Sequence, residues 1–294
     1  MSSTVSQETL EVPRELPTLD MEPEADNIAL SRLFERYRHA RRGMWRRSTI
    51  LLSLLTVVVG WSLFGTGFRL VSLLEGAMNS VRFVTEDMLP PDLSAVGPAL
   101  PGLADTVYMS FFGFVLSVVL SLGLAVLCAR NVTPNRAAGL LCRSTVSFIR
   151  SFPDIVFAII LVAAFGIGPV PGALALGIGG VGVLGKLFTE SLEEIDMTQL
   201  EGLRAAGAGW AQQIGQGVWP QFRPAFITWS LFRLDLNLRA AAVVGLVGAG
   251  GIGYDLNLKF NLFQFRQATT IMLMVFALIV VVEWITMKLR EKLV

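Results

Sequence analysis

The stretch "ESLEEIDMTQLEGLRAAGAGWAQQIGQGVWPQFRPAF" covers residues 190–226 and is a long polar segment inside a very apolar chain. Its pattern predicts two short helices, residues 197–206 and 210–218, joined by a glycine turn at Gly207 and Gly209. Insertion into the lipid bilayer gives no reason for a polar helix pair between two membrane spans. We therefore interpret this segment as a docking element for a partner.

The second helix of this pair carries a tryptophan at each end, with glutamines between them. Exposed Trp210 and Trp219 suit a protein partner better than bulk water, because tryptophan is enriched in protein interfaces. Pro220 follows directly, and a proline inside a helix removes a backbone hydrogen bond. We predict that Pro220 ends the second helix and directs the chain back into the membrane.

The composition indicates a polytopic membrane protein. Of 294 residues, 53% are hydrophobic and 16% are charged, whereas a soluble domain has about 25% charged residues. The chain has one histidine, His39, and two cysteines, Cys128 and Cys142, which fit no metal or redox spacing. The sequence therefore predicts no metal site and no histidine-based catalysis, and the net charge of +1 gives no indication of nucleic-acid binding.

Long apolar segments predict an all-α fold with six transmembrane helices, since a span needs about 20 apolar residues. The predicted spans are residues 48–68, residues 106–129, a third span starting near Ser144, residues 173–189, residues 225–249 and residues 267–287. The "GIGPVPG" stretch at 166–172 forms the hairpin between the third and fourth spans.

Arginine and lysine positions predict the topology of these spans. The basic flank before residue 48, the turn with Arg130, Arg136 and Arg143, and the basic C-terminal end are expected inside. The acidic segment 69–104 is expected outside, as a periplasmic or extracytoplasmic loop. Both termini and the segment 190–223 are then cytoplasmic.

Residues 1–47 form a predicted cytoplasmic tail of two parts. The first 30 residues carry seven acids and three prolines, which is typical of disorder and unlike a signal peptide. Between Arg32 and Arg47 seven arginines face a single acid, Glu35. This basic part is either an amphipathic helix at the membrane surface or a flank that sets the topology.

The pattern E-G-L-x3-G-x9-G-V-W-P, residues 201–220, resembles the EAA loop of ABC importer permeases, E-A-A-x3-G-x9-I-x-L-P. Glu201, Gly207 and Pro220 match, whereas Gly202 and Leu203 replace the alanines. The stretches "RSFPDIVFAIILVAAFGIGPVPG", from Arg150, and "NLRAAAVVGLVGAGGIG", from Asn237, look like the phosphonate-transporter branch of that family. The resemblance covers the chain from about Asp105 to the C-terminus.

This resemblance implies a function and partners. The chain would be one N-terminal helix added to a five-helix permease core, residues 105–294, working as a homodimer or beside a second, different permease chain. Two ATPase subunits, which bind ATP and Mg, would dock at Glu201, Gly202, Leu203, Gly207, Trp210 and Pro220. An extracytoplasmic binding protein would deliver the ligand, and the chain itself would be no enzyme. It would lie in a bacterial inner membrane.

The resemblance implies a phosphonate or a related oxyanion, phosphite or phosphate, as the substrate. A related importer for another small solute, such as methionine, and an ion-gradient-driven secondary transporter remain the alternatives. A membrane enzyme would need convergent catalytic side chains in the spans, and the sequence offers only acid–arginine pairs there.

Charged residues inside membrane spans are costly and usually functional. The fifth predicted span holds Arg233, Asp235 and Arg239, with Arg239 about 20 Å along the helix from its start at about 1.5 Å per residue. Asp235 and Arg239 are four residues apart, share a helix face and can pair.

Arg150 and Asp154 repeat this spacing in the third span, on either side of Pro153. In one interpretation each acid neutralises the arginine four residues away and fixes helix packing. In the other, Arg150, Arg239 or both face the translocation path and attract an oxyanion weakly, since a transported ion must leave again. The further candidates for the path are Ser151, Pro153, Asp154, Arg233 and Asp235.

Two glycine patterns look like nucleotide-binding motifs. Gly248, Gly250 and Gly253 spell G-x-G-x-x-G within "VVGLVGAGGIGYDL", but no acidic residue follows at the required distance of about 20 positions. Residues 180–186 read G-x-x-x-x-G-K, but leucine follows where a serine or threonine is needed. We interpret these glycines as close helix contacts, and those at 248, 250, 251 and 253 as the outer path and a hinge.

Overall fold

The computed structural model describes residues 48–67, 69–133 and 135–293, and the predictions for the N-terminal tail lie outside these residues. Every element of the described chain is helical, which confirms the all-α prediction. The chain divides into two units, Met1–Ala77 and Met78–Val294. The described part of the first unit contains an apolar helix, Ser48–Gly65, and the start of α2 (Leu70–Arg82).

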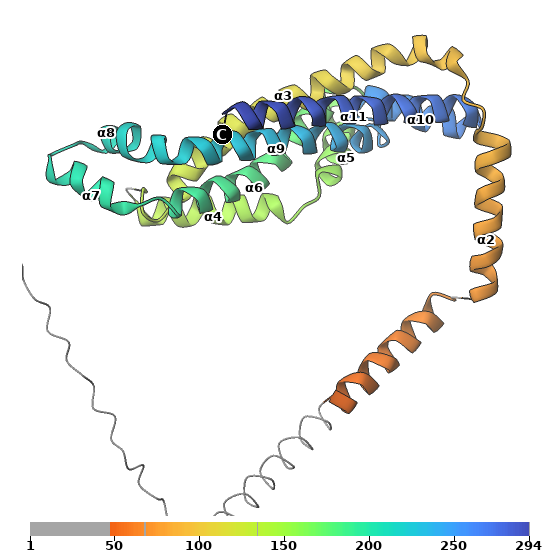
Figure 1. The fold of residues 1–294 in the computed structure, drawn as a ribbon, viewed down its shortest axis with the longest axis horizontal. Helices are drawn as coiled ribbons and strands as arrows, with labels where there is room; N and C mark the ends of the chain where they lie inside the picture. The colour runs from red at the N-terminus through yellow and green to blue at the C-terminus, as the bar shows by residue number, and fades with distance from the viewer. Residues whose placement is uncertain (1–47, 68, 134, 294) are drawn as a thin grey trace, which may run out of the picture. The chain divides into compact units, whose positions relative to one another are not determined.

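The second unit contains the rest of the chain (Figure 1). Its elements are η1 (Phe83–Met88), η2 (Leu93–Ala95), α3 (Val96–Cys128), α4 (Arg136–Arg150), α5 (Asp154–Phe165), α6 (Pro169–Glu193), α7 (Met197–Ala205), α8 (Trp210–Gln212), η3 (Gln213–Val218), α9 (Trp219–Gly245), α10 (Gly251–Asn261) and α11 (Phe265–Leu293). Helices α3, α6, α9 and α11 lie side by side along the unit, and the α7–α8 hairpin stands at one end.

Four described helices are long and apolar enough to cross a membrane: Ser48–Gly65, Leu93–Cys128, Pro169–Glu193 and Phe265–Lys292. The α4–α5 pair passes the same test but is bent by 85°. Helix α9 has 27 residues, about 40 Å at 1.5 Å per residue, but it carries several charges. The polytopic architecture is confirmed, and the count of six spans stays a prediction.

The structure changes three predicted boundaries. The second span begins ten residues earlier, at Val96, and part of the expected outer loop is helical, as α2 and η1. The third span is broken at residues 151–153, because proline restricts the residue before it to extended conformations. The fifth span ends at Gly245, and a separate helix, α10, follows it.

Glycines in α6 decide how tightly the bundle packs. A Cβ at Gly177 would meet Leu116 of α3 at 2.5 Å, and one at Gly182 would meet the backbone of Arg150 at 2.7 Å. Both glycines are buried inside a regular helix. The P-loop-like run therefore has a packing role, as the sequence interpretation expected: its small residues let neighbouring backbones approach closely.

Candidate functional site

A helical hairpin follows α6 at one end of the bundle and occupies the segment singled out by the sequence. Asp196 caps α7, and its carboxylate accepts a hydrogen bond from the Thr198 N–H at 2.9 Å, which lowers the pKa of this carboxyl. Helix α7 ends in a turn where Gly207 has φ +81°, a conformation that favours glycine. The prediction of a sharp glycine turn is confirmed.

Side chains hold the two arms of the hairpin together. The Gln221 amide exchanges two hydrogen bonds with the backbone of Asp196, at 2.9 and 3.3 Å. Arg204 Nε donates to Gln213 Oε1 at 3.0 Å near the turn. A Cβ at Gly217 would lie 2.9 Å from the Leu203 side chain, so that leucine packs directly onto the opposite arm. The hairpin is thus fixed at its base and near its tip.

One buried cluster joins this hairpin to the membrane helices. Its residues come from α3, α6, α7, η3 and α9 and the loop after α3: Ala125, Ala129, Val132, Leu184, Phe188, Leu192, Leu200, Val218 and Phe222. Phe188 and Phe222 are in edge-to-face contact, with ring centroids 5.5 Å apart. The hairpin therefore shares one densely packed core with α3, α6 and α9.

The outer edge of the hairpin is open. Glu201 and Gly202 are exposed, and Glu201 makes no ion pair or side-chain hydrogen bond within the described chain. Trp210 and Trp219 are 49% and 39% exposed, as predicted. The Trp210 indole N–H donates to the Val132 carbonyl at 3.2 Å, which holds this half-exposed ring in one orientation.

The prediction for Pro220 is wrong. The helix that begins at Trp210 continues through η3 into α9, and Pro220 lies in the first turn of α9. A π-helical turn precedes it, in which the Trp219 N–H bonds to the Ile214 carbonyl. A proline is tolerated at a helix start because its missing N–H is not needed there. The hairpin is therefore continuous with the long helix α9.

Arg233 of α9 is the most buried charge in the described bundle, with a side chain 3% exposed. Its guanidinium lies 3.3 Å from the Asp154 carboxylate and donates to the Leu176 carbonyl at 3.0 Å. The predicted pair of Arg150 with Asp154 is absent from the described contacts. Pairing at a spacing of four residues needs an unbroken helix, and the chain is broken between these two residues.

A polar seam surrounds Arg233, and the sequence analysis missed it. It consists of buried residues on the facing sides of α3 and α9: Ser110, Ser117, Ser121, Ser230, Arg233 and Asn237. The Asn237 amide donates to the Ser110 carbonyl at 3.2 Å. The signal was the spacing of three and four residues in S-x2-R-x3-N of α9, which places all three side chains on one face.

Arg239 lies further along α9 in a different setting. It pairs with Asp235 at 2.8 Å, as predicted, and also approaches Glu283 of α11 at 3.6 Å. The side chains of Arg239 and Glu283 are 46% and 51% exposed. Arg239 and Glu283 therefore lie on the surface of the single chain, whereas Asp235 is partly buried with a side chain 18% exposed.

Arg150 ends α4 at the break, where Ser151 and Pro153 are also exposed. It makes no ion pair within the described residues and lines a hollow of about 220 Å³. Lys186 lines the same hollow and pairs with Glu190 at 3.3 Å. The break thus presents a guanidinium without a described ion pair to a hollow that Glu190 and Glu193 also line.

The glycine turn after α9 has a packing role. Gly248, Gly250 and Gly251 have positive φ, and the last two are buried against the chain's own backbone or side chains. A Cβ at Gly253 would lie 2.0 Å from the Ala242 carbonyl oxygen. The turn at residues 246–250 separates α9 from α10, and the 166–172 hairpin packs against it. Of the four glycines proposed for the path, only Gly248 is partly exposed.

The sequence matches the profile of a family described as "Binding-protein-dependent transport system inner membrane component" over residues 121–292. It is 34% identical over 260 residues to the phosphite transport system permease protein PtxC of Stutzerimonas stutzeri, covering 87% of this chain and 94% of that protein. It is 34% identical over 238 residues to the phosphate-import permease protein PhnE of Mycolicibacterium smegmatis, covering 80% of this chain and 44% of that protein.

Solved structures show the same fold. The MetNI methionine ABC transporter in an inward-facing conformation matches with a TM-score of 0.60 and 20% identity, over 67% of this chain and 96% of that chain. A bacterial ABC transporter for the import of alginate matches with a TM-score of 0.56 and 13% identity, over 84% of this chain and 96% of that chain. At these identities the likeness concerns the fold alone.

Proposed function

The chain belongs to the family of inner membrane components of binding-protein-dependent transport systems, and we propose that it is the permease of an ATP-driven importer for a phosphorus oxyanion. The exposed hairpin α7–α8–η3, continuous with α9 and packed against α3 and α6, supports this proposal most directly. A mobile partner that pushes on this hairpin would move three membrane helices together.

Two ATPase subunits would dock on the open edge of the hairpin, one on each copy of this chain, and would bind ATP and Mg themselves. Glu201 has no partner within the described chain and offers a free carboxylate. Trp210 offers an aromatic surface that is held in place by Val132. An aromatic anchor beside a charged group is typical of residues that dominate binding at interfaces.

The end of the bundle that carries the hairpin would face the cytoplasm. Arg130, Arg136 and Arg143 lie at this end, where the Asn131 amide donates to the Leu192 carbonyl of α6 at 2.7 Å. Basic loops are retained on the cytoplasmic side of membranes. Both termini would be cytoplasmic, and the binding protein would deliver its ligand at the opposite end.

The exposed charges of α9 and α11 support a homodimer. Asp/Glu and Arg side chains within spans face a protein interior or a water-filled cavity, yet Arg239 and Glu283 lie on the surface of the single chain. A second copy facing them would enclose a polar path. Arg150, Ser151 and Pro153 at the broken helix, and the partly exposed Gly248, are the other candidates for its lining.

The names of the relatives support a phosphorus oxyanion as the substrate. Two guanidinium groups that are exposed on the single chain, those of Arg150 and Arg239, suit such an anion. Of these two, Arg150 alone has no ion pair among the described residues, so the attraction is moderate. This suits a transporter, which must release its ion again.

The substrate proposal is tested by reconstituting the permease with its ATPase and binding protein in liposomes. Phosphite, phosphate, methylphosphonate and methionine are supplied in turn, and ATP hydrolysis is measured. We expect a phosphorus oxyanion to stimulate hydrolysis at least fivefold. Stimulation by methionine alone would refute the substrate class and leave the importer mechanism standing.

A further inference from the structure

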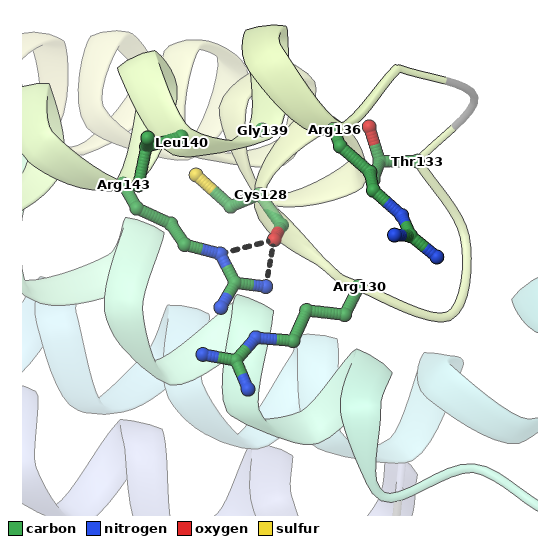
Figure 2. A pocket seen from close by; sticks show the side chains of 7 residues that line it. All are labelled: Cys128, Arg130, Thr133, Arg136, Gly139, Leu140 and Arg143. Carbon is green, nitrogen blue, oxygen red and sulfur yellow. Dashed lines mark hydrogen bonds between the residues drawn. The ribbon is translucent and has the colours of Figure 1, made fainter.

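A cavity of about 360 Å³ lies between the end of α3 and the start of α4, separate from the hairpin edge and from the exposed charges of α9. Its lining consists of Cys128, Arg130, Thr133, Arg136, Gly139, Leu140 and Arg143 (Figure 2). Three of these residues are arginines and none is acidic. Ligand sites typically have volumes of about 300–1,000 Å³, so the cavity is large enough for a phosphate group.

Arg143 is already held in position. Its guanidinium donates two hydrogen bonds to the Cys128 carbonyl, drawn as dashed lines in Figure 2, and pairs with Glu193 of α6. Glu193 also accepts from the Arg130 backbone N–H at 2.9 Å. This acid therefore neutralises Arg143 and fixes the loop, and leaves the charges of the other two arginines in excess.

The guanidinium groups of Arg130 and Arg136 make no ion pair or hydrogen bond within the described chain. Figure 2 shows both side chains as part of the cavity lining. Planar guanidinium groups match the oxygens of phosphate in pairs and are favoured for phosphate recognition. In Figure 2 the Arg130 side chain extends toward the fixed Arg143, and that of Arg136 points to the other side of the lining. The lining thus offers two unpaired guanidinium groups and a third that is fixed, which is the composition of a phosphate site.

The surroundings of the cavity place it at the membrane surface. It adjoins the end of the apolar span Leu93–Cys128, where headgroups meet the hydrocarbon. Leu127, Leu140 and Leu141 are exposed next to it, by 37%, 67% and 70%. A phosphate group bound there could carry an acyl chain along these leucines, and basic pockets between transmembrane helices bind anionic lipid headgroups in this way.

The loop that forms one wall of the cavity also holds the hairpin. Val132 accepts the hydrogen bond of the Trp210 indole and is buried in the cluster that contains Leu200 and Val218. An anion that fixed Arg130 would stiffen the segment 129–133, which contains Val132. Occupancy of the cavity is thereby linked to the position of the docking element.

We propose that the cavity between α3 and α4 binds a phosphate group, from an anionic phospholipid or from free inorganic phosphate, through Arg130, Arg136 and Arg143. Assigning the site to the cytoplasmic side rests on the proposed function. Binding itself does not, because it is measured without transport.

The experiment has two arms, and both use the assembled transporter. In one, native mass spectrometry counts phosphatidylglycerol retained against phosphatidylcholine. In the other, inorganic phosphate is titrated against the thermal unfolding midpoint of the transporter in phosphatidylcholine nanodiscs. The variant is Arg130→Gln with Arg136→Gln, and the matched control is Arg290→Gln with Lys292→Gln, which removes the same charge from the basic end of α11.

We expect binding by the cavity variant to fall at least fivefold in one arm, whereas binding by the control variant stays unchanged. Loss in the lipid arm identifies a headgroup, and loss in the phosphate arm identifies the free ion. Equal losses in variant and control, or no binding in either arm by the unsubstituted protein, would overturn the proposal. A transporter that binds phosphate groups here but shows no uptake would refute the proposed function alone.

Discussion

Two arginines on helix α9, six residues apart, have opposite environments. Arg233 is 3% exposed and is held by Asp154 and the Leu176 carbonyl. Arg239 is 46% exposed and pairs along its own helix with Asp235 and across to Glu283. The comparison teaches that the role of a charge on α9 is set by its partners. Arg233 fixes three helices of one chain, whereas Arg239 and its acidic partners lie where a second chain or an ion could reach the arginine.

Removing the buried charge of Arg233 should have the largest effect on stability. Arg233→Met leaves Asp154, whose side chain is 24% exposed, without its partner, and removing one partner of a buried pair costs about 3 kcal/mol at the lower end of the usual range. We expect a large fall in the thermal unfolding midpoint of the purified transporter and a low yield of assembled complex. Arg223→Gln, an exposed arginine at the start of the same helix, is the control and should leave both unchanged.

The acidic partners should differ in the same way. Asp154→Asn leaves the buried Arg233 without its charged partner and should destabilise the chain by about 3 kcal/mol or more. Asp154 and Asp235 are 24% and 18% exposed, so the pairs differ in their arginines, which are 3% and 46% exposed. Asp235→Asn leaves the half-exposed Arg239, and ion pairs of exposed side chains contribute about 0–1 kcal/mol. Chemical unfolding of both variants in the same detergent compares them. Equal losses of stability would show that burial does not distinguish the two pairs.

The packing around Arg233 offers a third comparison. A Cβ at Gly180 would lie 2.5 Å from the Ser117 Cβ and 2.9 Å from Arg233 Nε, whereas one at Gly123 in α3 would meet nothing within 4 Å. Overpacking costs about 1–3 kcal/mol, so Gly180→Ala should lower the unfolding midpoint. Gly123→Ala should not, since alanine favours a helix more than glycine does.

The smallest effect on stability, and the largest effect on transport alone, is expected for Arg239→Ala. Losing a half-exposed pair should cost less than about 1 kcal/mol, so the complex still assembles. We expect uptake of the phosphorus oxyanion to fall at least tenfold. Normal uptake by an assembled Arg239→Ala complex would remove Arg239 from the proposed path.

Much of this architecture could be predicted from sequence, because apolar length and glycine spacing are local signals. Helix α7, the Gly207 turn and the exposed tryptophans were predicted from such signals, and so was the pair of Asp235 with Arg239. The family resemblance came from the 201–220 pattern, and the profile match confirms it.

Long-range geometry could not be predicted. The sequence places Asp154 four residues from Arg150 and 79 residues from Arg233, yet the second arginine is its partner, because the chain breaks before Pro153. Pro220 was misjudged because a proline signals a helix end as readily as a helix start. The cavity with Arg130 and Arg136 depends on how α4 packs against α3, and spacing alone does not show it.

The central claim is that this chain couples ATP hydrolysis in a partner to the uptake of a phosphorus oxyanion. The most direct test is phosphite uptake into proteoliposomes that contain the permease and its ATPase, with ATP inside and loaded binding protein outside. We predict uptake that needs both ATP and the binding protein and persists when ionophores dissipate all ion gradients. Uptake that proceeds without ATP and stops with the ionophores would contradict the account.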